Sequence, residues 1–318
     1  MTVRHDWTIQ EIKDIYHLPL IELVHRAQLV HRQHNDPLKV QKCTLLSVKT
    51  GGCSEDCAYC PQAARYQTSV ESEKLMRVPD VLARARKAKE DGSTRFCMGA
   101  AWREVKDNRQ FDDILEMVRG VKALGMEVCC TLGMLKPEQA KKLKEAGLHA
   151  YNHNIDTSED YYSEVIGTRT FDDRLNTLEA VRQAGISVCT GGIIGLGETE
   201  ADRLSFLQRL ASFEPHPESV PINALVPVAG TPLEDQPPVE PLLLVRVIAT
   251  ARLLMPTTRL RLSAGRLSLS DEAQMLCFMA GANSIFSGEK LLTTPNPEVD
   301  RDAVTFAAVG VEPMPAGG

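Results

Sequence analysis

The chain has 318 residues, of which 43% are hydrophobic and 25% charged, and its formal net charge is −6. These values suit a globular protein and give no sign of a surface for nucleic acids or anionic membranes. Residues 1–10 hold charges and no apolar core, so we expect no secretory signal, and no apolar run has the length of a membrane span. We therefore expect a cytoplasmic protein, in which nine cysteines favour metal ligation over disulfides.

Hydrophobic spacing predicts helices within residues 8–32, as an N-terminal extension, and then a strand over 43–48. After a cysteine-rich loop, strands are predicted at 94–98, 127–132, 150–155, 187–191, 219–224, 259–263 and 284–286. Helices are predicted at 79–91, 111–124, 136–146, 170–184, 199–212, 240–255, 270–280 and 299–309.

Eight alternating units predict an α/β fold of the (β/α)8 TIM-barrel type, and a doubly wound open sheet is the alternative. Because no linker interrupts the pattern, we expect a single barrel domain over residues 1–318. Its parts would be a helical extension (1–40), a barrel core (41–298) and a C-terminal helix and tail (299–318).

Three cysteines, Cys53, Cys57 and Cys60, stand at spacings of four and three in the loop after the first predicted strand. Their thiolates can converge on one iron–sulfur or zinc centre. A closed structural zinc site needs four ligands, and the loop holds no further cysteine. A zinc site completed from elsewhere is therefore the weaker alternative.

Strand residues alternate between the barrel interior and the surrounding helices, so the pattern predicts which side chains point inward. The predicted interior set is Arg95, Cys97, Glu127, Cys129, Thr131, Asn152, Asn154, Asp156, Ser187, Cys189, Arg259, Arg261 and Ser263, with Tyr151, His153 and Ile155 on the opposite face. A single buried cysteine is commonly inert, but three from three strands together with Arg261 indicate a site. Such a polar interior implies a bound cofactor or substrate.

Other residues have structural interpretations. Cys130 has the opposite phase, and Cys43 and Cys277 lie in apolar contexts, so we assign all three to packing. The glycines within residues 191–197 suit either a tight strand-to-helix turn or close approach of a ligand. Asn154 and Asp156 could instead cap or brace a loop.

The cysteine loop, with Tyr59 before the last cysteine, resembles the cluster loop of radical S-adenosylmethionine enzymes, and longer segments narrow the resemblance to the biotin synthase family. These segments are residues 93–102 (STRFCMGAAW), 151–158 (YNHNIDTS), 220–223 (VPIN), 262–266 (LSAGR), 278–286 (FMAGANSIF) and 291–297 (LLTTPNP). The resemblance covers roughly residues 7 to 300. One departure is Leu267, where many members of the family have Glu.

The resemblance implies that Cys53, Cys57 and Cys60 hold a 4Fe-4S cluster whose remaining iron is chelated by the amino and carboxylate groups of S-adenosylmethionine. One electron from this cluster would release a 5'-deoxyadenosyl radical. The residues implied to contact S-adenosylmethionine are Tyr59, Asn154, Asp156, Arg174, Gly192 and Ile193.

The resemblance further implies a 2Fe-2S cluster, the sulfur donor, on Cys97, Cys129, Cys189 and Arg261. Arginine is an unusual iron ligand because a guanidinium has no lone pair to offer, and an ion pair with Glu127 is the alternative for Arg261. The implied substrate is dethiobiotin, with its ureido ring at Asn154 and Asn223 and its carboxylate at Thr293 and Thr294. Two C–H bonds are replaced, so two S-adenosylmethionine molecules would be used for each product.

The implied partners are an electron donor such as flavodoxin or ferredoxin and a second copy of the chain in a homodimer. Two other functions are open at this point. One is a different radical S-adenosylmethionine enzyme, of the hydrogenase-maturation or methylornithine type, and the other is a non-enzymatic zinc or iron–sulfur protein.

Overall fold

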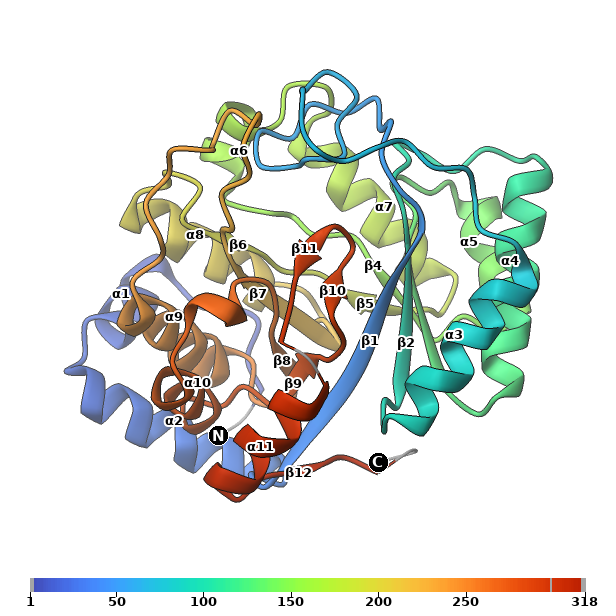
Figure 1. Cartoon of the computed structure of the whole chain (residues 1–318). Coiled ribbons are helices and arrows are strands. Elements are labelled where there is room, and N and C mark those ends of the chain that lie inside the picture. Colours follow the sequence, from blue (N-terminus) through green and yellow to red (C-terminus); the bar gives the residue numbers. More distant parts are fainter. Residues whose placement is uncertain (1–2, 298, 316–318) are drawn as a thin grey trace.

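The computed structural model describes residues 3–297 and 299–315; residues 1, 2, 298 and 316–318, which the predicted domain bounds include, lie outside this part. Parallel strands form the centre and helices surround them (Figure 1). The strands are β1 (Lys39–Lys49), β2 (Arg95–Ala100), β3 (Glu127–Thr131), β4 (Ala150–Asn152), β5 (Ser187–Cys189), β6 (Gly192–Ile194), β7 (Ser219–Ala224), β8 (Arg259–Leu262), β9 (Ser284–Phe286), β10 (Lys290–Leu291), β11 (Thr294–Pro295) and β12 (Glu312–Pro313).

The helices are α1 (Ile9–Tyr16), α2 (Leu20–His34), α3 (Val78–Glu90), α4 (Arg109–Ala123), α5 (Pro137–Ala146), α6 (Glu159–Val165), α7 (Phe171–Gln183), α8 (Glu200–Ala211), α9 (Pro241–Leu254), the 3₁₀ helix η1 (Arg266–Ser268), α10 (Asp271–Met279) and α11 (Val299–Val309). No helix among the described residues combines the length and the apolar character that crossing a membrane requires.

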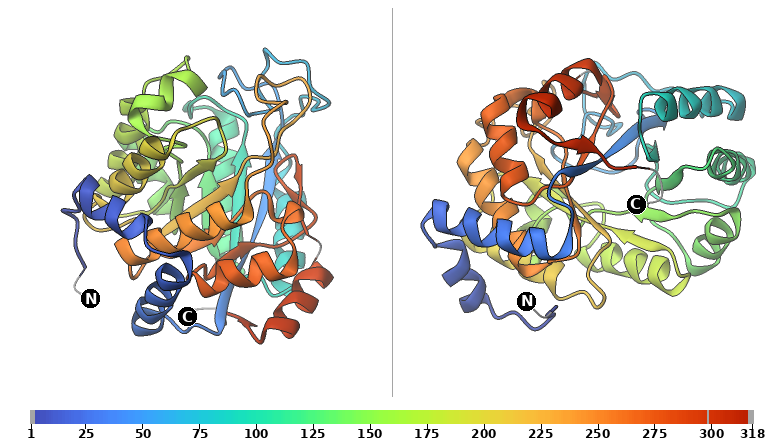
Figure 2. Two further views of the ribbon diagram at one scale, coloured as in Figure 1. Left: turned by 90° about the vertical axis from the view of Figure 1, so that its left-hand side faces the viewer. Right: turned by 90° about the horizontal axis from the view of Figure 1, so that it is seen from below.

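The strands close into a barrel. Their order is β1-β2-β3-β4-β5-β7-β8-β9, and β9 pairs with β1 as well as with β8, all in parallel. This closure confirms the TIM-type barrel and excludes the open doubly wound sheet. Viewed along the barrel, the helices surround the strands (Figure 2, right).

All eight predicted barrel strands and the helices between them are present, with ends that differ by a few residues. Five short elements were not predicted: α6, β6, η1, the β10–β11 hairpin and β12. Each is too short for hydrophobic periodicity to reveal it. Ser158 caps the start of α6, because its hydroxyl accepts a hydrogen bond of 3.1 Å from the backbone N–H of Tyr161.

The N-terminal extension folds as the predicted helices, separated near Pro19, and lies against α8 and α9. Thr8 and Glu11 form a capping box at the start of α1. Arg246 of α9 donates a hydrogen bond of 2.9 Å to the carbonyl of Leu18, between the two helices. The extension therefore covers the outside of the barrel and leaves its interior accessible.

The outward faces of the strands form the apolar layer against the helices. Phe96, Met98, Val128 and Cys130 are fully buried there, and Cys277 is a buried residue of α10. The packing role predicted for Cys130 and Cys277 is thus confirmed. The inward faces are polar, and the loops after the strands gather at one end of the barrel, which is where TIM-barrel sites lie.

Candidate active site

The loop after β1 folds back on itself and brings its three cysteines together above the barrel. Gly51 and Gly52 take φ values of 67° and 68°, a region that favours glycine, and the chain then turns. The N–H of Cys53 donates to the carbonyl of Gln62 (2.9 Å), and the N–H of Cys60 donates to the carbonyl of Cys57 (2.9 Å). These bonds fix the three sulfurs on one compact turn.

The loop is anchored to the segment between α6 and α7. One carboxylate oxygen of Asp56 accepts hydrogen bonds of 3.0 Å from the backbone N–H groups of both Gly167 and Thr168. The N–H of Ala58 donates to the carbonyl of Val165 at 2.9 Å. The cysteines are therefore held by contacts with a segment that is remote in sequence.

Beneath the loop lies a cavity of about 300 Å³, within the size range of ligand pockets. Its lining includes Cys53, Cys57, Tyr59, Cys60, Cys97, Trp102, Cys129, Thr131, Asn152, His153, Asn154, Asp156, Arg169, Arg174, Ile193, Asn223, Arg261, Ser263, Thr293 and Thr294. One cavity thus contains the loop cysteines and most of the predicted barrel residues. Cys189 and Gly192 lie behind its wall.

His153 differs from its prediction. It was expected on the outer face, opposite Asn152 and Asn154, yet it lines the cavity. β4 ends at Asn152, and beyond that residue the chain no longer alternates. Burial lowers the pKa of His153 well below its ordinary value, so the ring is neutral near pH 7.

The loop thiols are protonated in the metal-free protein. Burial raises the pKa of Cys57, and burial followed by the nearby Cys57 raises the pKa of Cys60 to about 12. All nine cysteines are free thiols. Metal binding must therefore displace protons from these sulfurs.

Asp156 is the polar centre of the upper cavity. Its Oδ2 accepts hydrogen bonds from the hydroxyl of Tyr59 (3.1 Å) and from Nη2 of Arg174, whose Nε donates to Tyr162 (2.8 Å). Asp156 has a φ of 67°, which is uncommon outside glycine and marks a strained position. Arg174, expected to be available for a ligand carboxylate, is thus already paired with Asp156.

Two predicted amides also brace the structure. Asn154 Oδ1 accepts from the N–H of Gly191 (3.2 Å), whereas Asn223 donates to the carbonyl of Gly192 (2.9 Å) and accepts from the N–H of Ala264 (3.1 Å). Both ends of the Asn223 amide are therefore in use.

The glycine turn has a packing reason. A Cβ on Gly192 would lie 2.3 Å from the carbonyl oxygen of Asp156 and 2.6 Å from the ring of Phe206. Gly192 is therefore needed for close contact between backbones, and its neighbour Ile193 lines the cavity.

Deeper in the barrel, Arg261 lies among cysteines. Its Nη1 is 3.8 Å from the sulfur of Cys189 and its Nη2 is 3.4 Å from the sulfur of Cys43. Cys97 and Cys129 are paired in register on β2 and β3, and Asn152 donates to the sulfur of Cys189 at 3.3 Å. The predicted inner set is therefore gathered in one place.

The packing role predicted for Cys43 does not describe it fully. Cys43 is fully buried in a cluster with Cys97 and Cys129, on the inward face of β1 and beside Arg261. Cys43 was the first residue of the predicted strand, whereas β1 begins at Lys39, so the inward phase of Cys43 was not recognised.

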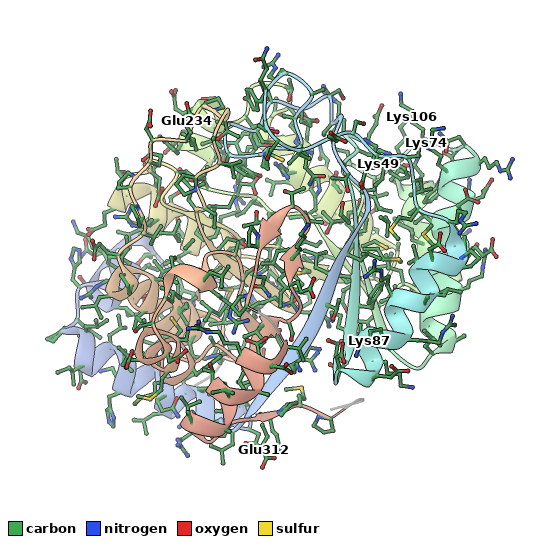
Figure 3. All side chains as sticks on the ribbon, in the orientation of Figure 1. Lys49, Lys74, Lys87, Lys106, Glu234 and Glu312 are labelled. Atoms are coloured by element: carbon green, nitrogen blue, oxygen red, sulfur yellow. The ribbon has the colours of Figure 1, made fainter. Side chains whose placement is uncertain are left out.

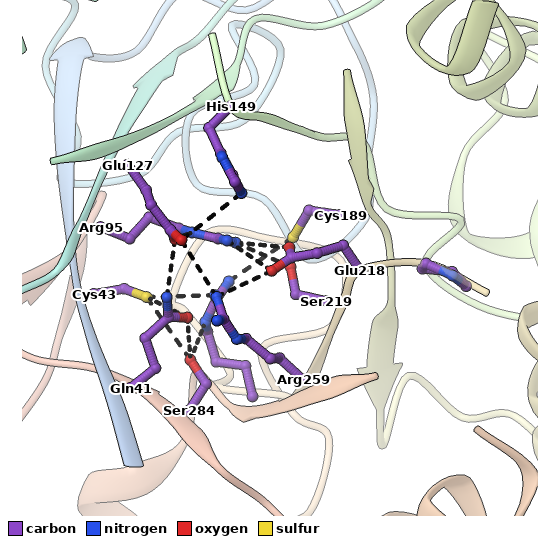
Figure 4. Close-up of polar contacts among 12 residues, drawn as sticks. Gln41, Cys43, Arg95, Glu127, His149, Cys189, Glu218, Ser219, Arg259 and Ser284 are labelled. Atoms are coloured by element: carbon purple, nitrogen blue, oxygen red, sulfur yellow. Dashed lines mark hydrogen bonds and ion pairs between the residues drawn. The ribbon is translucent and has the colours of Figure 1, made fainter. Parts of the chain in front are cut away.

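Glu127 does not pair with Arg261, the alternative considered above. Its carboxylate is 2.7 Å from Arg95 and 3.5 Å from Arg259, and Glu218 bridges the same two arginines (Figure 4). This network closes the barrel at the end away from the cysteine loop. Burial opposes ionisation, but Arg95 lowers the pKa of Glu218 to about 2.

Arg169 was not identified from the sequence. It is buried beside the loop cysteines, with Nε 3.7 Å from Glu55 Oε2, and Nη1 finds no hydrogen-bond acceptor among the described residues. A buried guanidinium with an unused N–H group suits an anionic ligand. Arg169 lies in the irregular segment between α6 and α7, where no hydrophobic periodicity indicates the direction of a side chain.

The β10–β11 hairpin places Thr293 and Thr294 on the cavity wall. Its tip, Leu292, packs so closely on β2 that a Cβ on Gly99 would lie 2.5 Å from Leu292 Cδ2. The hairpin therefore holds the two hydroxyl-bearing residues against the barrel opening.

No three His, Cys, Asp or Glu side chains within residues 3–297 and 299–315 are arranged to hold a single metal ion. A cluster imposes a different geometry, because its thiolates bind different iron atoms and stay farther apart. The two groups of free cysteines on one cavity fit cluster ligation in this respect.

A parallel barrel whose first strand leads into this three-cysteine loop is the architecture of the radical S-adenosylmethionine superfamily, and the model of that superfamily matches residues 47–210. A second model, the biotin and thiamin synthesis associated domain, matches residues 221–312. Biotin synthase from Cytophaga hutchinsonii is 63% identical over 98% of this chain and 92% of its own length. Biotin synthase from Myxococcus xanthus is 64% identical over 98% and 90%. The chain belongs to the biotin synthase family.

Solved structures support the fold. Methylornithine synthase superposes with a TM-score of 0.80, at 19% identity, over 96% of this chain and 94% of its own. A maturase of the [FeFe]-hydrogenase superposes with a TM-score of 0.81, at 18% identity, over 96% and 72%. These identities are too low to carry function. The alternative functions considered above are therefore less well supported than that of the family.

Proposed function

We propose that this chain is a biotin synthase, which inserts sulfur into dethiobiotin by radical chemistry. The observation that carries the proposal is the near full-length identity of 63–64% to biotin synthases, in a chain that has loop cysteines and barrel cysteines on the wall of one cavity. A single domain over residues 1–318 remains part of this proposal.

At the outer end, Cys53, Cys57 and Cys60 would hold the 4Fe-4S cluster. Three free thiols on one hydrogen-bonded turn fit a cluster that leaves one iron for S-adenosylmethionine. The chemistry supplied by these bound groups is one-electron cleavage of S-adenosylmethionine to a carbon radical. The chain holds the ligands in place and excludes water.

S-adenosylmethionine would lie between the loop and Asp156. The Asp156 carboxylate suits the ribose hydroxyls, with Asn154 beside it and Ile193 and Tyr59 on the cavity wall. Gly192 would act indirectly, because its lack of a side chain lets the backbone of Asp156 lie close to β6.

Arg174 would orient Asp156 through their ion pair. A guanidinium N–H group that is not used in this ion pair would contact the methionine carboxylate. We add Arg169 to this set, because its unused N–H group lies on the same wall.

At the inner end, Cys97, Cys129, Cys189 and Arg261 would hold the 2Fe-2S cluster that donates sulfur. Contact with Cys129, together with burial, raises the pKa of Cys189 well above its ordinary value, so this thiol also loses a proton only to a metal. Arg261 on β8 reaches Cys189 on β5 across the intervening strand β7.

Dethiobiotin would occupy the cavity between the two cysteine groups. Asn154 and Asn223 would lie near the ureido ring. Because the Asn223 amide already bonds to the backbone of Gly192 and Ala264, its main role would be to hold these two segments together. Thr293 and Thr294 on the hairpin would meet the carboxylate. The barrel's contribution is to hold the reacting carbon near the donor sulfur.

The electron donor would be a flavodoxin or a ferredoxin. Lys49, Lys74 and Lys106 lie at the end of the barrel that carries the cysteine loop (Figure 3). Arg103 pairs with Glu55 of that loop at 3.5 Å. A basic surface there suits an acidic redox partner. A cytoplasmic location and a homodimer complete the proposal.

The proposal is tested by anaerobic reconstitution with iron and sulfide, followed by assays for S-adenosylmethionine cleavage and for biotin. Cys189→Ala is expected to keep cleavage and lose biotin formation. Cys130→Ala is the matched control, because Cys130 is equally buried but faces the helices, and it should keep both activities. Biotin formation by Cys189→Ala would contradict the assigned sulfur-donor site.

A further inference from the structure

The inner site contains a fourth thiol that the family resemblance does not use. Cys43 lies on β1 with no exposed surface, and its sulfur is 3.4 Å from Nη2 of Arg261. The same guanidinium reaches Cys189 with Nη1 and donates from Nε to Ser284 at 3.0 Å. One planar group therefore lies between two sulfurs.

The strand order places Cys43 in a gap of the ligand ring. Around the barrel, Cys97 is on β2, Cys129 on β3, Cys189 on β5 and Arg261 on β8. β9 and β1 lie between β8 and β2, and Cys43 is the thiol on β1. Cys43, Cys97 and Cys129 belong to one buried cluster.

Simple packing would not require these polar surroundings. The sulfur of Cys43 is 3.4 Å from Oε1 of Gln41 and 3.7 Å from the hydroxyl of Ser284 (Figure 4). It also accepts a hydrogen bond from Nη2 of Arg261. A buried thiol that serves only as a small apolar group is normally surrounded by apolar side chains. Here it faces a guanidinium, an amide oxygen and a hydroxyl instead.

Coordination chemistry makes Cys43 able to replace Arg261 as a ligand. Two irons of a 2Fe-2S cluster take four protein ligands, and thiolate is the usual one. A guanidinium is protonated and offers no lone pair, whereas a thiol needs only to release one proton to bind ferric iron. Because Arg261 and Cys43 are in contact, both reach the same region of the site.

We propose that Cys43 is an alternative fourth ligand of the inner cluster, which binds iron when the side chain of Arg261 is withdrawn. The proposal rests on the proposed function, because it assumes the inner cluster. In the four-thiolate form, the sulfur of Cys43 binds the iron that Arg261 otherwise faces, and the thiol proton is released.

The experiment compares four reconstituted proteins: wild type, Cys43→Ser, Arg261→Met and the double variant. Iron and sulfide contents, visible absorption and Mössbauer spectra report the inner cluster without using biotin formation. Arg261→Met is expected to retain about two irons and two sulfides beyond the outer cluster, with the spectrum of a four-thiolate centre. The double variant should lose that pair of irons, while Cys43→Ser alone keeps it.

The reduction potential provides a second readout. Exchange of Arg261 for a thiolate ligand makes the net charge of the cluster and its ligands more negative. The inner cluster of Arg261→Met should therefore have a lower reduction potential than that of the wild type. If Arg261→Met does not fold, Arg261→Lys replaces it with the same pairing and the same expectations. Cys130→Ser is the control for removal of a buried thiol and should leave all spectra unchanged.

Two results would overturn the role of Cys43: equal loss of the inner cluster in the single and double arginine variants, or its retention in the double variant. A wild-type protein that assembles only the outer cluster would overturn the proposed function as well. The two failures are distinguishable, since only the second affects the wild type.

Discussion

Arg95 and Glu218 are joined by two parallel hydrogen bonds, Nη1 to Oε2 at 2.9 Å and Nη2 to Oε1 at 2.7 Å. The side chain of Arg95 is fully buried, and Glu218 is only partly exposed. This fork-to-fork pair closes the barrel below the inner cysteines, and together with Glu127 it compensates the buried charge of Arg95.

Glu218→Gln is therefore expected to destabilise the protein by about 3–5 kcal/mol, because it leaves Arg95 buried with a weaker partner. Urea unfolding at pH 7 measures the difference. Glu312→Gln is the control, since Glu312 pairs with Lys39 on the surface and its loss should cost less than about 1 kcal/mol. Equal effects of the two variants would contradict the importance of burial.

The acid stability of the protein should depend on His31. Burial, with Arg252 nearby, lowers the pKa of this ring from 6.5 to about 3. The folded state keeps His31 neutral while the unfolded state takes up a proton below pH 6.5. Stability from this residue is thus complete above pH 6.5 and declines as the pH falls toward 3.

His31→Gln is expected to remove up to about 1.4 kcal/mol per pH unit from the pH dependence of unfolding between pH 6 and 4. Urea titrations of both proteins at several pH values measure it. His25→Gln, on the same helix, is the control. An unchanged slope in His31→Gln would show that the ring is not held neutral.

Arg169→Gln should weaken binding of S-adenosylmethionine by roughly 10- to 100-fold, the loss expected for one hydrogen bond to a charged group. Isothermal titration of the anaerobically reconstituted protein measures the Kd. Arg65→Gln is the control, because Arg65 is exposed and pairs with Asp56 outside the cavity. Unchanged affinity in Arg169→Gln would remove this residue from the site.

Thr293→Val and Thr294→Val should each raise the KM for dethiobiotin by about tenfold and leave the Kd for S-adenosylmethionine unchanged. Valine keeps the shape of threonine and removes its hydroxyl. Thr257→Val, at an exposed position between α9 and β8, is the control. A change in the Kd for S-adenosylmethionine, without a change in the KM for dethiobiotin, would show that the hairpin contacts S-adenosylmethionine.

Period-two alternation explains how much of the site could be predicted from the sequence. It identified Cys97, Cys129 and Arg261 as interior residues because a strand fixes the direction of every second side chain. The same rule stopped at His153, where β4 ends. Arg169 lies in an irregular segment, and no periodicity reports where such a side chain points. The inward direction of Cys43 depended on the true length of β1, which begins at Lys39.

The proposed function requires both groups of cysteines to serve one reaction in one cavity. The most direct test is to incubate the anaerobically reconstituted, reduced protein with dethiobiotin and S-adenosylmethionine, and to measure biotin, 5'-deoxyadenosine and protein-bound sulfide together. We predict biotin with two molecules of 5'-deoxyadenosine for each product and a matching loss of sulfide from the protein. Cleavage of S-adenosylmethionine without biotin, in protein that contains both clusters, would contradict the account.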